Sequence, residues 1–144
     1  GSLSNMACVD ADLAMACARA AHTADWDLIF VAMPGTEMEK AGEKLGLRVA
    51  REIFADRNYT DDGQLVSRKL ENAMIHDAEY AARRVVRMVQ DQEIVSLDGK
   101  RIPVAVDTVC VHGDTPTAVA MAAEIRDALK AEGIAIKPMA EFVS

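Results

Sequence analysis

Short apolar runs alternate along this chain with longer segments in which apolar residues recur every three or four positions. Three runs predict strands and a fourth, shorter run is a weaker candidate: Leu28–Met33, Leu47–Phe54, Val104–Val111 and Ile134–Ile136. The first run carries no polar residue on either face, which is typical of a parallel strand covered by helices on both sides. The pattern therefore predicts buried strands that alternate with amphipathic helices.

Two amphipathic segments in the first third of the chain predict helices. Asp10 can cap a helix that runs to Ala21. Thr36 with Glu39 makes a capping box for a second helix, and Gly46 can end that helix in the left-handed conformation. The residues expected to face inward are Leu13, Cys17 and Ala20 or Ala21 in the first helix, and Met38, Ala41 and Leu45 in the second.

The second half of the chain predicts two more helices. Asp77 can cap a helix that runs to Gln90, and Thr115–Pro116 can cap and start another, which Gly133 ends. The turn-forming residues 58–63 predict a surface loop over 56–68, and 97–100 predict a hairpin or turn. The residues expected to face inward are Ala78, Ala82, Val85 and Val89, then Ala118, Met121, Ala122, Ile125 and Leu129.

Strands that alternate with helices imply parallel pairing through right-handed crossovers, so the predicted class is α/β. Three or four strands are few for a closed barrel or a full doubly wound sheet, and the pattern does not decide between the two. Gly1–Ser2 are typical of residues left after tag removal. We expect residues 3–144 to form a single α/β domain.

Composition and charge narrow the function classes. The chain has 144 residues, 51% of them hydrophobic, and a net charge of −7, without a basic stripe to neutralise phosphates, so nucleic acid is not an expected partner. The apolar run 28–33 is too short to cross a bilayer, and a cytoplasmic location is expected. Three cysteines, an odd number, suit reduced, buried thiols better than disulfides.

An ordered set of motifs resembles the LamB/YcsF family, which includes one of the subunits of the bacterial ATP-dependent 5-oxoprolinase. The resemblance covers most of the chain, from the first helix to about Gly133. The residues that carry it are Phe54-Ala-Asp-Arg57, Tyr59, Asp62-Gly63, Leu65-Val66, Arg68, Ala73, Ile75, Asp77 and Cys110-Val-His-Gly-Asp114. No single tetrapeptide is decisive, but the order of the set is specific.

The resemblance implies a fold, a reaction and partners. The fold is an irregular β/α barrel, TIM-like and of the deacetylase type. The reaction opens the lactam of 5-oxo-L-proline to L-glutamate with cleavage of ATP, with Mg²⁺ as the expected companion of the nucleotide. The partners are two other subunits of the enzyme, and the family is also associated with carbohydrate metabolism. The chain has no Gly-x-x-x-x-Gly-Lys-Ser/Thr loop, so it would contact ATP in another way.

The chain also departs from the family pattern. Family members begin with a strand resembling Asp-Leu-Asn-Ala-Asp and continue with Ala-Cys-Gly-x-His-Ala-Gly-Asp and Lys-Pro-His-Gly-Ala-Leu-Tyr segments. None of these occurs in this sequence. We therefore expect the chain to be the C-terminal part of a longer family protein, to be inactive in isolation, and to self-associate through apolar edges that the missing part would cover.

Catalytic candidates lie where polar residues follow two of the predicted strands. His112 is suited to general acid or base catalysis because its unperturbed pKa is about 6.5, and the alternative is a turn histidine bonded to the backbone. Asp114 can orient His112 or a water molecule, but it also suits a helix start. Asp56 is the third candidate, and it can instead form an ion pair with Arg57 within the loop.

Other candidates are assigned to binding. Arg57 is an expected anion clamp, and Glu52, Tyr59 and Arg68 are expected substrate or inter-subunit contacts, with packing or surface charge as their alternatives. The turn from Gly113 to Thr115 is the candidate phosphate contact, because N–H groups at a helix start point at an anion.

Two other function classes remain open from sequence. One is a metal-dependent, deacetylase-like hydrolase with His112, Asp114 and Asp56 as ligands, although their spacing matches no known metal signature. The other is a noncatalytic docking subunit, in which exposed Tyr59, Arg68 and their neighbours form a docking surface for catalytic partners.

Overall fold

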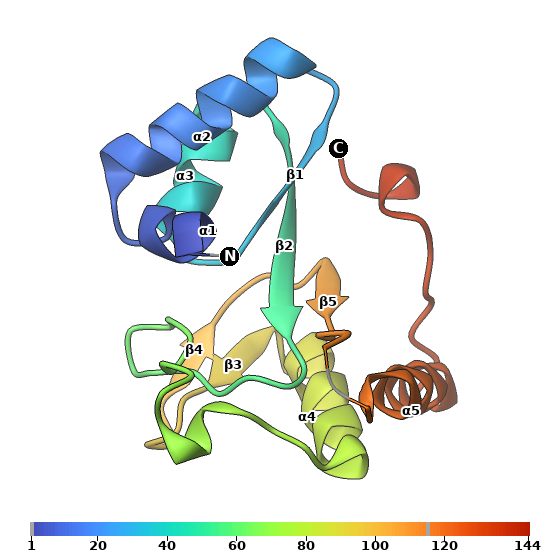
Figure 1. The fold of residues 1–144 in the computed structure, drawn as a ribbon. Coiled ribbons are helices and arrows are strands. Elements are labelled where there is room, and N and C mark those ends of the chain that lie inside the picture. The colour runs from blue at the N-terminus through green and yellow to red at the C-terminus, as the bar shows by residue number, and fades with distance from the viewer. Residues whose placement is uncertain (1, 115) are drawn as a thin grey trace. The chain divides into compact units, whose positions relative to one another are not determined.

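The structure, a computed structural model, describes residues 2–114 and 116–144. It divides into two compact units. The first unit contains residues 1–52 and 138–144, and the second contains residues 53–137. Figure 1 shows the elements of both.

The first unit is built on a strand–helix–strand motif. Strand β1 (Ile29–Ala32) leads through helix α3 (Glu37–Lys44) into strand β2 (Arg48–Phe54), and the two strands pair in parallel with Ile29 opposite Arg48. The unit also contains α1 (Ser2–Ala7), α2 (Ala11–Ala24) and a 3₁₀ turn, η2 (Met139–Glu141). The predicted parallel pairing is therefore confirmed.

Helix α3 packs tightly against both strands. A side chain at Gly42 would place its Cβ 2.8 Å from Val49 Cγ2 and 2.9 Å from Phe30 Cδ1, so only glycine fits there without a shift. Gly46 has φ +71°, which confirms the predicted left-handed helix end. Met38 and Ala41 are buried, as expected.

Several details of the first unit differ from the sequence predictions. Helix α1 was not predicted. Helix α2 buries Ala14 and Ala18, which were not named, whereas the expected Leu13, Cys17 and Ala21 are half-buried and Ala20 is exposed. Strand β1 is shorter than predicted and is not covered on both sides, because Val31 is 39% exposed.

The predicted capping box at Thr36 and Glu39 is wrong in its hydrogen bonds. The Thr36 hydroxyl donates to the Met33 carbonyl at 2.7 Å and does not cap α3. The Glu39 carboxylate accepts a hydrogen bond from the Gly35 N–H at 2.6 Å. In a capping box the donor would be the N–H of the next residue, Thr36. The helix still begins after Thr36, so the motif predicted the boundary but not the contacts.

The second unit has a helical core beside short strands. It contains η1 (Glu71–Ala73), α4 (Ala78–Asp91), β3 (Glu93–Val95), β4 (Arg101–Pro103), β5 (Thr108–Cys110) and α5 (Ala118–Ala131). Helices α4 and α5 pack against each other through the core residues Ala81, Ala82, Val85, Met121, Ile125 and Leu129 (Figure 1). Asp77 caps α4 by accepting from the Tyr80 N–H, as predicted.

The strands of the second unit are partly as predicted. β3 and β4 form an antiparallel hairpin with Ile94 opposite Ile102, which confirms the turn expected at residues 97–100. Strand β5 is much shorter than the run 104–111 that predicted it. Its neighbour is β2, and the Ala55 N–H, directly after β2, donates to the Cys110 carbonyl at 3.0 Å.

The end of the chain differs from prediction in three places. Residues 134–136 do not form a strand: Gly133, at φ +73°, ends the helix, and the Ile134 N–H donates to the Leu129 carbonyl. Helix α5 begins at Ala118, two residues later than Thr115–Pro116 would start it, and Thr117 makes no side-chain cap. Ala122 is exposed, although it was expected to face inward. Thr115 itself lies outside the described residues.

The segment 56–68 is a surface loop only in part. Asp61, Asp62, Ser67 and Arg68 are exposed, whereas Asp56, Arg57, Tyr59 and Val66 are all 5% exposed or less. The Asn58 N–H donates to the Ala73 carbonyl, and the Ile75 N–H donates to the Asp56 carbonyl, at 3.0 and 2.8 Å. The turn formers were identified correctly, but backbone hydrogen bonds hold part of the segment inside the unit.

The α/β class with parallel strands is thus confirmed, whereas the irregular barrel stays a prediction.

All three cysteines are free, Cys8 is buried, and that burial raises the pKa of its thiol. None of the helices in the described part of the chain is long and apolar enough to cross a membrane.

Candidate functional site

Asp56 and His112 meet in the second unit because they follow neighbouring strands. Asp56 comes two residues after the end of β2, and His112 two residues after the end of β5. The hydrogen bond from Ala55 to Cys110 fixes the register between the two chain segments. Each candidate therefore lies just past the carboxyl end of its strand, as predicted from the sequence.

The contact between the two side chains is close and double. His112 Nδ1 lies 2.8 Å from Asp56 Oδ1 and 2.9 Å from Oδ2, and the His112 backbone N–H donates to Oδ2 at 3.1 Å. An ionised carboxylate only accepts hydrogen bonds, so Nδ1 carries the proton. In the neutral ring, this leaves the lone pair on Nε2, the arrangement required of a general base.

Burial distinguishes the roles of the two residues. The Asp56 side chain is 5% exposed, whereas that of His112 is 23% exposed. The imidazole also stacks on Phe54, with ring centroids 5.6 Å apart and planes inclined by 21°. The carboxylate thus holds the ring from within, Phe54 supports it from one side, and the imidazole is the member of the pair that solvent or a substrate can reach.

Arg57, the residue after Asp56, is buried and does not face solvent. It is 5% exposed, and its Nη2 donates to the Val66 carbonyl at 2.6 Å, while its Nε is buried without a partner. Burial, more than any neighbouring charge, lowers the pKa of its guanidinium. Arg57 therefore supports the segment after Asp56, and an anion would reach it only after that segment moved.

Tyr59 and Arg84 brace the end of β2. The Tyr59 side chain is fully buried, and its hydroxyl accepts from the Phe54 N–H at 2.7 Å. The Arg84 guanidinium lies over the Tyr59 ring, 5.3 Å from its centroid, and donates to the carbonyls of Phe54 at 3.2 Å and Ala55 at 3.5 Å. Tyr59 was expected either to contact a substrate or subunit or to pack in the core, and in the structure it packs in the core.

Arg84 was not among the sequence candidates. It occupies an inward position of α4, three residues after buried Ala81 and four before buried Met88. A basic residue in such a position is the signal that could have identified it, because buried guanidinium groups need specific partners. Burial lowers the pKa of Arg84, and the partners that offset part of this effect include Tyr59, Tyr80 and Asp56.

The remaining candidates differ in their contacts and exposure. Asp114, two residues after His112, forms an ion pair with Arg68 at 3.5 Å, with side chains 61% and 50% exposed. Gly113 is exposed, and Thr115, the other expected phosphate contact, is outside the described residues. Glu52 is half-buried in the part of β2 that belongs to the first unit.

Metal ligation needs several donor side chains that converge on one point. Over residues 2–114 and 116–144, no three His, Cys, Asp or Glu side chains are placed to hold one ion. The Asp56–His112 pair provides two such groups, with Asp114 turned to Arg68.

Comparison with known proteins agrees with the motifs. A family profile described as the LamB/YcsF family matches residues 1–144. The chain is 54% identical over 140 residues to a Rhodopseudomonas palustris (strain BisB18) protein named as the A subunit of 5-oxoprolinase, covering 97% of this chain and 55% of that protein. A Nitrobacter hamburgensis protein of the same name is 51% identical over 138 residues, covering 96% and 54%.

A solved structure shares the fold. The crystal structure of the lactam utilization protein from Thermus thermophilus matches with a TM-score of 0.84 and 39% sequence identity, covering 95% of this chain and 54% of that one. The chain therefore spans about half the length of the relatives that it matches.

Proposed function

Since the chain belongs to the LamB/YcsF family, we propose that it forms part of the A subunit of an ATP-dependent 5-oxoprolinase, with Asp56 and His112 as its proton-transfer pair. The reaction is hydrolysis of the lactam of 5-oxo-L-proline to L-glutamate, coupled to ATP cleavage and carried out with two other subunits. The names of the 5-oxoprolinase relatives support the activity. The Asp56–His112 contact supports the assignment of residues.

The chemistry explains why such a pair is useful. An amide carbon is a poor electrophile, and transfer of the ATP γ-phosphoryl group to the lactam oxygen makes that carbon reactive toward water. His112 Nε2 takes a proton from the attacking water while Asp56 stabilises the imidazolium that forms. The ring C–N bond then breaks as the imidazolium returns its proton to the departing nitrogen, which leaves γ-glutamyl phosphate. A second water molecule hydrolyses this acyl phosphate to glutamate and inorganic phosphate.

The observation that carries this proposal is the double contact between a buried carboxylate and a partly exposed imidazole at two adjacent strand ends. The alternative from sequence was a turn histidine bonded to the backbone, whereas the His112 ring contacts a buried carboxylate. Desolvating Asp56 is costly without compensation, and the His112 ring and backbone N–H supply that compensation.

The test uses the full-length protein that contains this chain, assembled with its partner subunits. We would measure ADP and glutamate formation from 5-oxoproline and ATP for wild type, His112→Ala and His76→Ala, the last being an exposed histidine outside the pair. General acid–base catalysis by a positioned side chain contributes about 10²–10⁴-fold, so His112→Ala should lose turnover by that factor while His76→Ala keeps it.

Folding and assembly must be intact in each variant, as shown by co-purification and circular dichroism. Equal turnover in His112→Ala and wild type would remove His112 from the mechanism. An assembled wild-type complex without turnover would contradict the 5-oxoprolinase activity itself and favour a docking role.

A further inference from the structure

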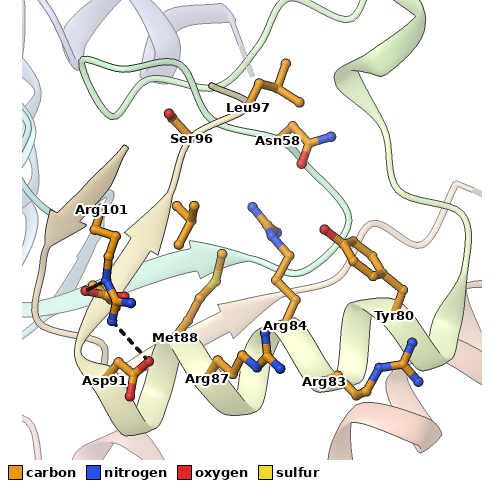
Figure 2. A pocket seen from close by; sticks show the side chains of 12 residues that line it. Asn58, Tyr80, Arg83, Arg84, Arg87, Met88, Asp91, Ser96, Leu97 and Arg101 are labelled. Carbon is orange, nitrogen blue, oxygen red and sulfur yellow. Dashed lines mark hydrogen bonds and ion pairs between the residues drawn. The ribbon is translucent and has the colours of Figure 1, made fainter. Parts of the chain in front are cut away.

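Helix α4 carries an arginine that is partly buried inside the second unit. Arg84 lies on the wall of a pocket of about 670 Å³ between α4 and the β3–β4 hairpin. Figure 2 shows Arg84 rising from α4 between Met88 and Tyr80, toward Asn58. Burial of a charged group costs free energy unless specific partners compensate, so the partners of Arg84 indicate what this residue does.

The partners of Arg84 are the two backbone carbonyl groups that come directly before Asp56. Arg84 Nη1 donates to the Phe54 carbonyl at 3.2 Å and to the Ala55 carbonyl at 3.5 Å. The first distance is that of an ordinary hydrogen bond, and the second is at the outer limit. The guanidinium group therefore holds the backbone that leads into the candidate carboxylate.

The same guanidinium group contacts Tyr59, which restrains the other side of Phe54. Arg84 lies over the Tyr59 ring, 5.3 Å from its centroid, an arrangement that attracts a cation to an aromatic face. The Tyr59 hydroxyl accepts from the Phe54 N–H at 2.7 Å. Both polar backbone groups of Phe54 are thus held, the N–H by Tyr59 and the carbonyl by Arg84.

Phe54 and Asp56 are the two residues that orient the His112 ring. The Phe54 ring stacks on the imidazole with centroids 5.6 Å apart, and the Asp56 carboxylate lies 2.8 and 2.9 Å from His112 Nδ1. Both come from the short stretch 54–56. The stretch that orients the imidazole is therefore the one whose backbone Arg84 holds.

We propose that Arg84 is a positioning residue for the Asp56–His112 pair, holding residues 54–56 so that the imidazole keeps one orientation and one tautomer. The inference rests on the proposed function, because this pair is the one proposed to transfer the proton. Arg84 acts through backbone carbonyls and the Tyr59 ring, so its loss should slow turnover without weakening substrate binding.

Three variants of the full-length protein test this role. Arg84→Met keeps an unbranched side chain but removes the charge and the hydrogen-bond donors. Arg84→Lys keeps the charge on a compact ammonium group, which lacks the planar fork of donors. Arg83→Met is the matched control, because Arg83 precedes Arg84 on α4, is exposed, and pairs with Glu79.

The first readout is steady-state turnover of 5-oxoproline and ATP by each variant, assembled with the partner subunits. A misplacement of about 1 Å at a reacting group can cost about 10²-fold in rate, so kcat of Arg84→Met should fall by about tenfold or more. KM should stay near that of wild type. Arg84→Lys should lie between wild type and Arg84→Met, and Arg83→Met should match wild type. An unchanged kcat in Arg84→Met, or a loss confined to KM, would overturn the proposal.

The second readout does not depend on turnover. NMR spectra of the imidazole nitrogens, recorded on the full-length protein alone at a pH where the ring is neutral, report which nitrogen carries the proton. Comparison with His112→Ala assigns the signals. We expect the Nδ1–H tautomer in wild type and Arg83→Met, and a mixture of both tautomers in Arg84→Met. A single tautomer in Arg84→Met, with or without a loss of kcat, would overturn the positioning role.

The two readouts separate this proposal from the function on which it rests. A wild-type complex without turnover, together with mixed tautomers in Arg84→Met, would contradict the 5-oxoprolinase activity and still support Arg84 as the residue that positions the pair. If circular dichroism shows that Arg84→Met does not fold, Arg84→Lys decides. A lower kcat or mixed tautomers in that variant would support the proposal, and wild-type values of both would overturn it.

Discussion

The two units of this protein treat charge in different ways. In the first unit, Arg51 forms ion pairs with Glu39 and Glu43 that are partly exposed, and Thr36, which is neutral, is a buried polar side chain. In the second unit, Asp56 and Arg57 are both 5% exposed or less. A buried charge costs free energy unless specific partners compensate, and this difference is the reason that we propose the second unit as the place of the chemistry.

The largest expected effect tests that difference on activity. Asp56→Asn keeps the size of the side chain but removes the negative charge that fixes the His112 tautomer and stabilises its protonated form. We expect turnover of the assembled enzyme to fall by about 10²-fold or more, measured as glutamate formation. Glu43→Gln, which removes a surface carboxylate of the first unit, is the matched control and should retain wild-type turnover. An Asp56→Asn variant with normal turnover would place the chemistry elsewhere.

The next effect concerns stability in the second unit. Tyr59→Phe removes the hydroxyl that accepts from the Phe54 N–H, in a site where the side chain is 1% exposed. A buried donor left without a partner costs about 1–3 kcal/mol, and the free energy of unfolding should fall by that amount in urea titrations. Tyr80→Phe, which alters an exposed tyrosine, is the control. A Tyr59→Phe variant as stable as wild type would mean that water replaces the hydroxyl.

A smaller effect is expected from packing in the first unit. Gly42→Ala places a Cβ within 3 Å of Val49 and Phe30, and overpacking of this kind costs about 1–3 kcal/mol. Alanine is also the better helix former by about 1 kcal/mol, so the net loss of unfolding free energy should be about 1 kcal/mol. Lys44→Ala, at an exposed position of the same helix, should show no loss. A stabilised Gly42→Ala variant would show that α3 can move away from the strands.

The smallest effect is expected at a surface ion pair. Glu43→Gln weakens the contact with Arg51 Nη2 at 2.6 Å, but the Glu43 side chain is 51% exposed and Arg51 retains Glu39. Exposed ion pairs contribute about 0–1 kcal/mol, so the urea midpoint of unfolding should change little. The change should be smaller still in roughly 0.5 M salt, because salt screens exposed charges and the screening length is already about 10 Å at 0.1 M. A loss as large as that of Tyr59→Phe would remove the contrast between the two units.

Sequence patterns correctly predicted the features that depend on contacts between residues close together in the chain. Asp77 caps α4 through a contact three residues along the chain, and Gly46 ends α3 by its own φ angle, so both were visible in the sequence. Asp56 and His112 were also predicted as site residues, because each follows a run of apolar residues. Parallel strands bring such positions together without further information.

Features that depend on distant contacts were not predicted. The turn formers after Asp56 suggest a surface loop, but hydrogen bonds to residues 73–75 hold part of that segment inside the second unit. Only three residues of the apolar run 104–111 are in β5. Arg84 was missed because its role is set by carbonyl groups thirty and twenty-nine residues earlier in the chain. The ion pair between Asp114 and Arg68, which are 46 residues apart in the chain, was not predicted either.

A double-mutant cycle on Asp56 and His112 tests the central claim most directly. Turnover of the assembled enzyme would be measured for wild type, Asp56→Asn, His112→Ala and the double variant. If the two residues act as one unit, the double variant loses no more activity than His112→Ala alone, because Asp56 acts only through the imidazole. Losses that multiply would show that the two side chains act independently, and would contradict the assignment of this pair as the proton-transfer site.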